Sequence, residues 1–466
     1  MNTKALRQKI LDLAIHGKLV PQDPNDEPAS VLLEHIRAEK ERLIKEGKIK
    51  KPKKSKAACD KPHYPFELPK GWVWTTLGEI GSWQSGATPS RMNKDYYGGN
   101  IPWLKTGDLN DGTIIYIPEY ITQRALEETS VRLNPKGSVL IAMYGATIGK
   151  IGILSFPATT NQACCACYEY SINQMFLFYF LLANRENFIA MGGGGAQPNI
   201  SKEKIISTNM PLPPLKEQER IVEEIERWLS FVDIVEKEKS DLQLTICLAK
   251  SKILDLAIHG KLVPQDPNDE PASELLKRIN PKAVITCDNP QYGKLPKGWC
   301  ETYLGELFNH NTGKALNSSN TEGTMRDYLT TSNVYWNTFD FSVVKKMLFK
   351  DNELEKCSVT KGDLLVCEGG DIGRAAIWNL NYDICIQNHI HRLRPKVNLC
   401  VPFYYYTLYY LKVKNMIGGK GIGLLGLSSN ALHKIHCPLP PLSEQHRIVT
   451  KIEELFAQLD KIEASL

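Results

Sequence analysis

The longest regular pattern in the chain is a series of apolar residues at alternating steps of four and three. Its members are Ile221, Ile225, Trp228, Val232, Val235, Leu242, Ile246, Ala249, Ile253 and Leu256, and only Lys239 interrupts it. This spacing predicts one apolar seam along a long helix. The proline-rich residues 211–214 predict where the helix starts, and Gly260 with Pro264 predicts where it stops.

A second seam of the same kind is cut by the ends of the chain. It consists of Ile448, Ile452, Leu455, Leu459, Ile462 and Leu466. Its continuation is at the other end of the sequence, where Leu6, Ile10 and Leu13 match Ala249, Ile253 and Leu256. Two such seams bury their apolar residues most simply by packing against each other in antiparallel directions.

Repeated segments show that the chain is duplicated. Residues 9–30 recur without a change as residues 252–273. The segment L-P-K-G-W at 68–72 returns at 295–299, and P-L-P-P-L at 211–215 returns at 438–442, each time followed by E-Q-x-R-I-V. Internal repeats of this kind indicate repeated structural units.

The residues between these landmarks differ greatly but keep a common framework. Residues 136–140 (K-G-S-V-L) parallel 361–365 (K-G-D-L-L), and 145–150 (G-A-T-I-G-K) parallel 369–374 (G-G-D-I-G-R). They predict short strands separated by glycine turns, and the aromatic runs that follow predict one amphipathic helix per half. The expected fold class is α+β, with two globular α/β modules joined by two long antiparallel coiled-coil helices in a pseudo-twofold cyclic repeat.

The repeats also give the expected domain boundaries. These are a helix and loop at 1–36, a basic linker at 37–67, a first module at 68–210, a central coiled-coil spacer at 211–279, a linker at 280–294, a second module at 295–437 and a final helix at 438–466. A helix of about 25 residues spans about 37 Å, close to one turn of B-DNA. The helices alone are also typical of a structural coiled coil or an oligomerisation stalk.

Composition is that of a soluble globular protein, which we expect to be cytoplasmic. Hydrophobic residues make up 42% of the chain, charged residues 23%, and the net charge of +5 permits nucleic-acid binding without arguing for it. The twelve cysteines include one C-C-x-C cluster at 164–167, but no H-x-x-x-H element completes a tetrahedral zinc set, so buried free thiols are expected and no metal site is. The lysine-rich stretch between Lys45 and Lys56 could contact DNA phosphates, but we favour a solvated linker because the corresponding segment of the second half lacks it.

Several motifs that could carry chemistry lack the necessary context. Residues 421–426 fit G-x-G-x-x-G but follow a helical aromatic run instead of a strand, so we interpret them as a loop. The sequence has no phosphate-binding G-x-x-x-x-G-K-[ST], no N/D-P-P-Y/F methyltransferase signature and no convincing nuclease constellation. His16 and His259 are expected to cap helix ends. We therefore expect no catalytic residue, no metal and no enzymatic activity.

The layout resembles the DNA-specificity (S) subunits of type I restriction-modification systems along essentially the whole chain. The resemblance is carried by P-L-P-P-L-x-E-Q-x-R-I after both modules and by the repeated I-L-D-L-A-I-H-G-K-L-V-P-Q. A third feature is the opening of the first module, S-G-A-T-P-S-R at 85–91 and G-N-I-P-W-L-K-T-G-D at 99–108. The second module departs from it, with N-T-G-K at 311–314 and no I-P-W-L-K-T-G-D.

The resemblance implies a non-catalytic subunit. Each module would be a target-recognition domain that reads one half of an asymmetric two-part site in double-stranded DNA. The helices would set the spacing and dock two methyltransferase (M) subunits, and nuclease-translocase (R) subunits would join them. S-adenosylmethionine, ATP and Mg would belong to those partners. Alternatives are an S subunit of a methyltransferase-only or type II-like system, and a coiled-coil scaffold with two protein-binding modules.

Candidate contacts follow from side-chain chemistry. Phosphate contacts position a protein on DNA, and base-edge contacts specify the sequence. The phosphate candidates are Lys105, Lys150 and Arg374; the base candidates are Thr88, Arg91, Gln197, Asn199, Lys314, Ser332, Asn333 and Lys420. For each of them a role in supporting the fold is an open alternative. The residues expected to form the coiled coil and dock subunits are Ile221, Ile225, Trp228, Val232, Ile448, Ile452, Leu455 and Leu459.

Overall fold

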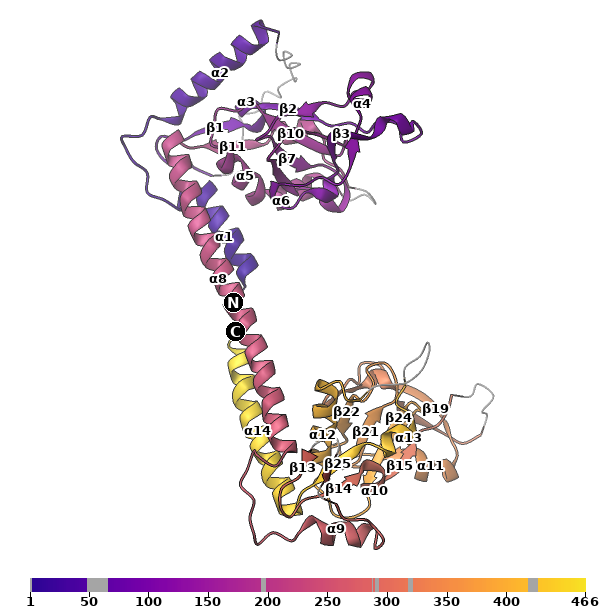
Figure 1. The fold of residues 1–466 in the computed structure, drawn as a ribbon. Coiled ribbons are helices and arrows are strands. Elements are labelled where there is room, and N and C mark those ends of the chain that lie inside the picture. Colours follow the sequence, from indigo (N-terminus) through magenta and orange to yellow (C-terminus); the bar gives the residue numbers. More distant parts are fainter. Residues whose placement is uncertain are drawn as a thin grey trace. The chain divides into compact units, whose positions relative to one another are not determined.

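A computed structural model describes residues 2–47, 66–193, 198–286, 288–289, 293–316, 322–417 and 426–466. The chain divides into two compact units, Met1–Glu238 and Lys239–Leu466, and helix α8 (Leu215–Ile258) passes from the first into the second (Figure 1). The candidates Gln197 and Lys420, residues 421–425 of the glycine motif and the lysines from 48 to 56 lie outside the described residues.

The first unit contains two sheets and a strand pair. One sheet has the order β2-β10-β7-β8-β4, the other β5-β3-β9-β6, and β1 pairs with β11. The strands are β1 (Val73–Thr76), β2 (Ser82–Ser85), β3 (Tyr97–Leu104), β4 (Gly112–Ile114), β5 (Tyr120–Ile121), β6 (Leu133–Asn134), β7 (Val139–Ala142), β8 (Ile151–Leu154), β9 (Ala158–Thr160), β10 (Cys164–Tyr168) and β11 (Asn209–Leu212). The α-helices before α8 are α1 (Thr3–Ile15), α2 (Ala29–Lys45), α3 (Leu77–Ile80), α4 (Gln123–Glu128), α5 (Gln174–Ala183), α6 (Arg185–Met191) and α7 (Lys202–Ile206).

The second unit repeats this arrangement. Its sheets have the orders β15-β24-β21-β22 and β19-β16-β23-β20, and β14 pairs with β25 as β1 does with β11. The strands are β12 (Asp288–Asn289), β13 (Gly293–Lys294), β14 (Cys300–Tyr303), β15 (Phe308–Thr312), β16 (Thr324–Leu329), β17 (Val334–Tyr335), β18 (Thr338–Phe339), β19 (Lys345–Phe349), β20 (Ser358–Val359), β21 (Leu364–Cys367), β22 (Ala375–Ile377), β23 (Ile384–Ile386), β24 (Ile390–Pro395) and β25 (His436–Leu439). The helices are α9 (Ala272–Ile279), α10 (Leu304–Leu307), α11 (Asp351–Cys357), α12 (Val401–Val413), α13 (Ser429–His433) and α14 (Leu442–Ala464). The mixed α+β class and the duplication are confirmed.

The predicted pairs of matching strands and turns occupy equivalent places. Strand β7 follows the turn at Gly137, and β21 follows the turn at Gly362; both glycines have a positive φ, of 88° and 93°. Each glycine N–H donates to a neighbouring strand end, to the carbonyl of Leu154 or of Trp378, at 2.8 Å. A side chain at either position would strain the backbone, which explains why the glycine persists in both halves.

The aromatic runs form the central helices α5 and α12, but the prediction that they are amphipathic is wrong. Helix α5 lies between strands β7 and β8 and helix α1, and α12 lies between β22 and α14. Nearly every side chain of α5 is buried, as are most of α12. A helix covered on opposite faces needs apolar residues all round, which a single apolar stripe does not describe.

Within each unit a shorter helix packs on α8 in the antiparallel direction. In the first unit Arg7 of α1 pairs with Asp233 at 2.5 Å and with Glu236 at 2.9 Å. In the second unit Lys250 pairs with Asp460 of α14 at 2.7 Å. Helix α8 starts at Leu215 and ends at Ile258, as the prolines before it and Gly260 after it predicted.

The predicted seam is only partly buried. Ile221, Ile225 and Val232 are at most 2% exposed, whereas Trp228 is 42% exposed. Val235 and Leu242 are also exposed. Helix α1 has only 13 residues, so it covers a limited length of α8. The pattern predicts an apolar stripe correctly, but the length of the partner helix decides which part is covered.

Helix α2 continues beyond the boundary expected at residue 36. Its side chains Leu32, Leu33 and Ile36 are buried in the core of the first unit. The helix runs on to Lys45, so the first part of the segment interpreted as a basic linker is helical. No helix among the described ranges is long and apolar enough to cross a membrane.

Candidate nucleic-acid interface

The loop that opens the first module is held at its start by a glycine. A Cβ on Gly86 would lie 2.2 Å from the carbonyl oxygen of Thr160, and the next residue, Ala87, donates its N–H to that oxygen at 2.9 Å. In the second module a Cβ on Gly313 would lie 1.9 Å from the carbonyl oxygen of Ile386. Only glycine fits such an approach, so S-G-A-T-P and N-T-G-K form the same junction despite their different letters.

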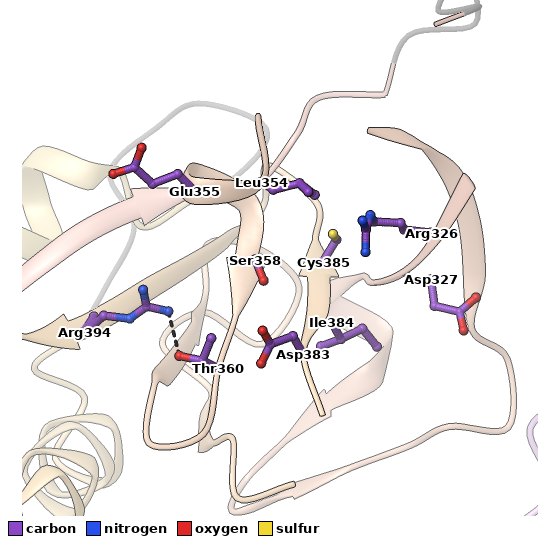
Figure 2. Close-up of a pocket in the computed structure, with 10 residues that line it drawn as sticks. All are labelled: Arg326, Asp327, Leu354, Glu355, Ser358, Thr360, Asp383, Ile384, Cys385 and Arg394. Carbon is purple, nitrogen blue, oxygen red and sulfur yellow. Dashed lines mark hydrogen bonds between the residues drawn. The ribbon is translucent and has the colours of Figure 1, made fainter. Parts of the chain in front are cut away.

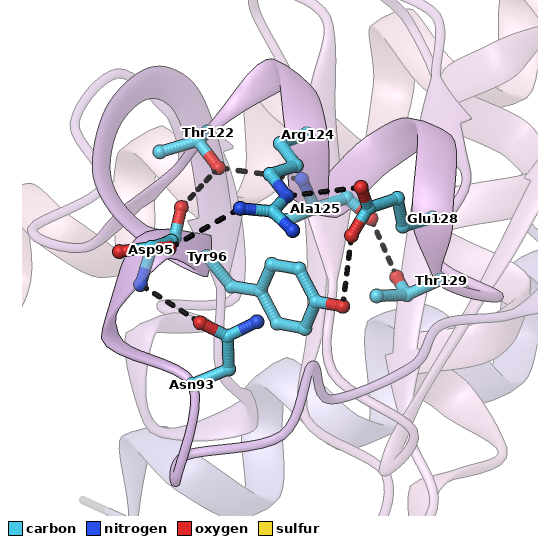
Figure 3. Close-up of polar contacts among 8 residues, drawn as sticks. All are labelled: Asn93, Asp95, Tyr96, Thr122, Arg124, Ala125, Glu128 and Thr129. Atoms are coloured by element: carbon cyan, nitrogen blue, oxygen red, sulfur yellow. Dashed lines mark hydrogen bonds and ion pairs between the residues drawn. The ribbon is translucent and has the colours of Figure 1, made fainter.

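The far end of this loop is fixed by a polar network (Figure 3). Arg124 of α4 pairs with Glu128 at 2.9 Å and with Asp95 at 3.2 Å. The Thr122 hydroxyl donates to the carbonyl of Asp95 at 2.8 Å, and the Tyr96 hydroxyl donates to Glu128 at 3.2 Å. The segment that carries Thr88 and Arg91 is thus tied to the sheet at one end and to α4 at the other.

Three sequence-predicted candidates, Thr88, Arg91 and Lys105, lie on this loop or against it. Arg91 donates to Glu119 at 2.9 Å, and Lys105 forms an ion pair with the other oxygen of the same carboxylate. The Thr88 hydroxyl bonds to the Gln162 side chain. Arg91 is 54% and Lys105 40% exposed, so both cations are accessible to a ligand.

Lys150 and Asn199 belong to a second pair of adjacent loops in the first module. The N–H of Gly145, at the start of the turn that ends in Lys150, donates to the carbonyl of Pro198 at 2.8 Å. Tyr144 and Asn199 form an isolated bridge next to it. Asn199 is exposed, and Lys150 is half-buried.

The turn of the first module that follows β3 recurs in the second module with other residues. Asp108 accepts the N–H of Lys105 at 2.8 Å, and Asn333 accepts the N–H of Thr330, also at 2.8 Å. The motif I-P-W-L-K-T-G-D is absent from the second module, but the capped turn that it forms is present. Asparagine and aspartate can both accept this hydrogen bond, which is why the equivalence was hidden in the sequence.

Candidates of the second module divide into a cluster and two largely buried residues. Arg374 donates to the carbonyl of Thr331 at 2.5 Å and lies 4.6 Å from the ring centre of Tyr335, beside the exposed Ser332. Asn333 is 3% exposed and donates to two backbone carbonyls. Lys314 is 11% exposed and pairs with Glu353 at 2.5 Å. These contacts favour the fold-supporting role for Asn333 and Lys314.

A polar pocket of the second module contains basic residues that the sequence reasoning missed (Figure 2). It is lined by Arg326, Asp327, Leu354, Glu355, Ser358, Thr360, Asp383, Ile384, Cys385 and Arg394. Arg394 donates to Thr360 at 2.8 Å and is held by the buried carboxylate of Asp363 at 2.7 Å. The sequence did offer one signal for Arg394. Arg392 and Arg394 stand at alternate positions of β24, so both side chains point to the same side of the sheet, and buried arginines are rare unless they are paired.

The buried thiols of the described residues are unsuited to nucleophilic chemistry. Nine thiols are buried and one, Cys247, is exposed, contrary to the expectation that all are buried. Burial raises the pKa of Cys165 to about 12 and of Cys367 to about 11, so both remain protonated at neutral pH. Among the residues that the structure describes, no group of three or more His, Cys, Asp or Glu side chains is arranged so that it could hold a metal ion.

The repeated histidines contact helix ends, as predicted. The ring Nδ1 of His16 lies 2.6 Å from the carbonyl oxygen of Asp12, and that of His259 lies 2.7 Å from the carbonyl oxygen of Asp255. Each ring thus satisfies a carbonyl in the last turn of its helix.

Most coiled-coil candidates are buried inside their own unit. Ile448 and Ile452 are fully buried like Ile221, whereas Leu455 and Leu459 are half-buried. Trp228 is the exposed member of the set, and its indole N–H donates to Glu224 at 2.7 Å. Only Trp228 and the half-buried leucines could meet a partner without repacking of the helix pair.

Comparison with known proteins gives one consistent result. The family described as type I restriction modification DNA specificity domain matches residues 69–244 and 296–466. The chain is 28% identical to the specificity subunit of the type I restriction enzyme EcoAI of Escherichia coli, over 98% of this chain and 90% of that relative.

Two solved structures share the fold. A chain of a type I restriction-modification system has a TM-score of 0.63 and 21% identity, over 86% of this chain and 94% of that one. The HsdS subunit from Thermoanaerobacter tengcongensis has a TM-score of 0.51 and 22% identity, over 86% of this chain and 93% of that one.

Proposed function

Because this chain belongs to the type I restriction-modification DNA specificity family, we propose that each of its modules reads one half of an asymmetric two-part DNA site. Membership makes it a specificity subunit and not a catalytic one. The methyltransferase chemistry, with its S-adenosylmethionine, and any ATP- and Mg-dependent cleavage belong to partner subunits. In this proposal the chain selects the sequence on which those partners act.

The observation that supports the proposal is that the two modules share a framework of strands and turns but carry different side chains on it. The two modules share the order of four strands in each sheet, the glycine junctions at Gly86 and Gly313, and the capped turns at Asp108 and Asn333. The side chains on or beside these turns differ: the accessible Arg91 and Lys105 in the first module, and the exposed Ser332 and the half-buried Arg374 in the second. One scaffold presenting two sets of donors suits two different half-sites.

Phosphate and base contacts are assigned by exposure. Lys105, Lys150 and Arg374 are proposed to contact phosphates, and Thr88, Arg91, Asn199 and Ser332 to reach base edges. Gln197 and Lys420 remain candidates from the sequence alone.

The unchanged repeat supports two copies of one methyltransferase partner. Part of it is explained by the fold: Gln22 bonds to Glu217 at 3.2 Å, and Gln265 bonds to Glu444 at 3.1 Å. Several identical positions are exposed in both copies and make no core contact: Lys18 and Lys261, Pro21 and Pro264, Pro24 and Pro267, Asn25 and Asn268. Equal surfaces bind equal partners, so we propose that one M subunit docks beside each copy, with the exposed Trp228 region of α8 as part of the contact. R subunits would join where a system includes a nuclease.

Methylome sequencing tests the proposal. A strain that carries this chain with its methyltransferase partner should methylate adenines in one two-part motif, and deletion of this chain alone should remove that motif. If the methylated motif is the same in both strains, the specificity role is refuted.

A further inference from the structure

We propose that Glu119 is a positioning residue that holds Arg91 ready to read one guanine in the half-site of the first module. The inference rests on the proposed function and adds a residue that no sequence motif indicated. Glu119 lies just before strand β5, and its backbone carbonyl accepts the N–H of Trp103 at 2.9 Å. Its place relative to β3 is therefore fixed by the sheet.

The carboxylate of Glu119 connects two cations. Its Oε2 accepts from Arg91 Nη2 at 2.9 Å, and its Oε1 pairs with Lys105. The Glu119 side chain is 33% exposed, between cations that are more exposed. Such a residue can orient both side chains while leaving their outer surfaces open.

Two aromatic rings, at 78° to each other, lie next to the guanidinium of Arg91. Its guanidinium carbon lies 4.4 Å from the ring centre of Tyr97 and 5.0 Å from that of Trp103. The two rings are themselves fixed, since the Tyr97 hydroxyl donates to the carbonyl of Pro89 at 2.6 Å and the Trp103 indole donates to the carbonyl of Ala87 at 3.0 Å. Cation–π contacts with both rings restrict where the guanidinium can lie, and the hydrogen bond to Glu119 restricts its orientation further.

An arginine held in this way is suited to guanine. The guanidinium has five N–H donors in one plane, and the only side-chain acceptor that contacts them in the described structure is Glu119. The remaining donors can bond to O6 and N7 of guanine in the major groove. Ordering a long side chain before binding removes a cost that DNA would otherwise have to offset. The negative charge also opposes indiscriminate attraction of Arg91 and Lys105 to phosphates.

Three variants of the full chain, each assembled with its methyltransferase partners, distinguish recognition of a base by Arg91 from general attraction of its charge to DNA. E119Q removes the charge that holds both cations. R91K keeps a cation but loses the planar fork. E127Q is the matched control, because Glu127 is an exposed carboxylate of α4 in the same module, bonded to Gln123 instead of a cation.

The expected result is a change at one base pair. E119Q and R91K should both relax the specificity for the same guanine in the half-site of the first module. The specificity for the other half-site should stay unchanged. Binding of E119Q to the cognate duplex should weaken about tenfold, while binding to a duplex altered at that guanine should change less than threefold. E127Q should behave as wild type.

Several outcomes would overturn the inference. The first is that E119Q still discriminates fully against a duplex altered at the guanine. The second is that the specificity relaxes at an A·T pair or in both half-sites. The third is that E119Q and R91K lose all methylation in complexes that assemble normally. If E119Q does not assemble, E119D takes its place: the shorter side chain keeps the charge but withdraws the carboxylate from Arg91, so the specificity for the same guanine should relax, and full discrimination by E119D would overturn the inference. A wild-type chain that directs no two-part motif would instead contradict the proposed function itself.

Discussion

Asp363 shows how a single buried charge organises the second module. Its carboxylate accepts from Arg394 at 2.8 and 2.7 Å and from the N–H of Thr360 at 2.8 Å, and the residue is 1% exposed. In the first module Ser138 stands at this place and bonds to the carbonyl of Pro135 at 2.7 Å. The direction of the side-chain hydrogen bond is therefore reversed between the modules: Asp363 accepts from the first residue of the turn, whereas Ser138 donates to it, because Pro135 has no N–H.

Replacing this carboxylate should destabilise the second unit. D363N leaves Arg394 without its charged partner, and we expect a loss of about 2–3 kcal/mol in the free energy of opening of β21. D327N is the control: Asp327 pairs with Lys346 at 3.5 Å on the surface and should cost less than about 1 kcal/mol. Hydrogen exchange of β21 peptides measures both, and equal effects would contradict the assigned role.

A histidine pair gives the second unit a dependence on pH. His391 lies 2.7 Å from the carbonyl oxygen of Leu427 and must donate from Nε2, so its Nδ1 accepts from His310 at 2.9 Å. Burial lowers the pKa of His310 to about 4, and the nearby His391, His433 and Arg392 act in the same direction. Burial also lowers the pKa of His391.

Stability should therefore fall as the pH decreases from about 6.5 to about 4. In this window the unfolded histidine binds a proton that the folded one does not, so the free energy of unfolding rises with pH. H310Q keeps a donor to His391 but cannot titrate, and its stability should change less steeply over the same range. Thermal unfolding between pH 4 and 7 measures the slopes; an equally steep slope in H310Q would argue against His310 as a source.

At the scale of elements, the long helix was the most predictable part. The apolar steps between Ile221 and Leu256 and the prolines before them locate α8 correctly, because helix periodicity and capping are local properties. The exposure of Trp228 was not predictable, since it depends on how far α1 extends along α8. The equivalence of Asp108 and Asn333 was also hidden, because a capped turn needs an acceptor and not a particular residue.

The helix gives a direct test of its proposed role as a spacer. Insertion of seven helix-forming residues between Glu238 and Lys239 keeps the heptad phase and adds about 10 Å of helix. We expect the gap in the methylated motif to grow by about three base pairs, at about 3.4 Å each, with both half-sites unchanged. Five inserted residues would instead rotate the second module by about 140° around the helix, and methylation should be lost. An unchanged gap after the seven-residue insertion would refute the spacer role.

At the scale of the whole molecule, the duplication could be predicted from exact repeats in the sequence, and the family from the order of those repeats. The candidate interface could be predicted only in part. Arg91 and Lys105 were both named as candidates from the sequence, but Glu119 between them and the rings of Tyr97 and Trp103 come together only through the fold. Arg326 and Arg394 were missed for the same reason. Residues that act as a cluster are dispersed in the sequence, so spacing alone cannot identify them.

The central claim is that each module reads its own half of the DNA site. Its most direct test is to exchange residues 73–210 for the corresponding module of another specificity subunit and to sequence the methylome of the resulting strain. We predict that one half of the motif changes completely while the other half and the gap persist. A change in both halves, or in neither, would contradict modular reading.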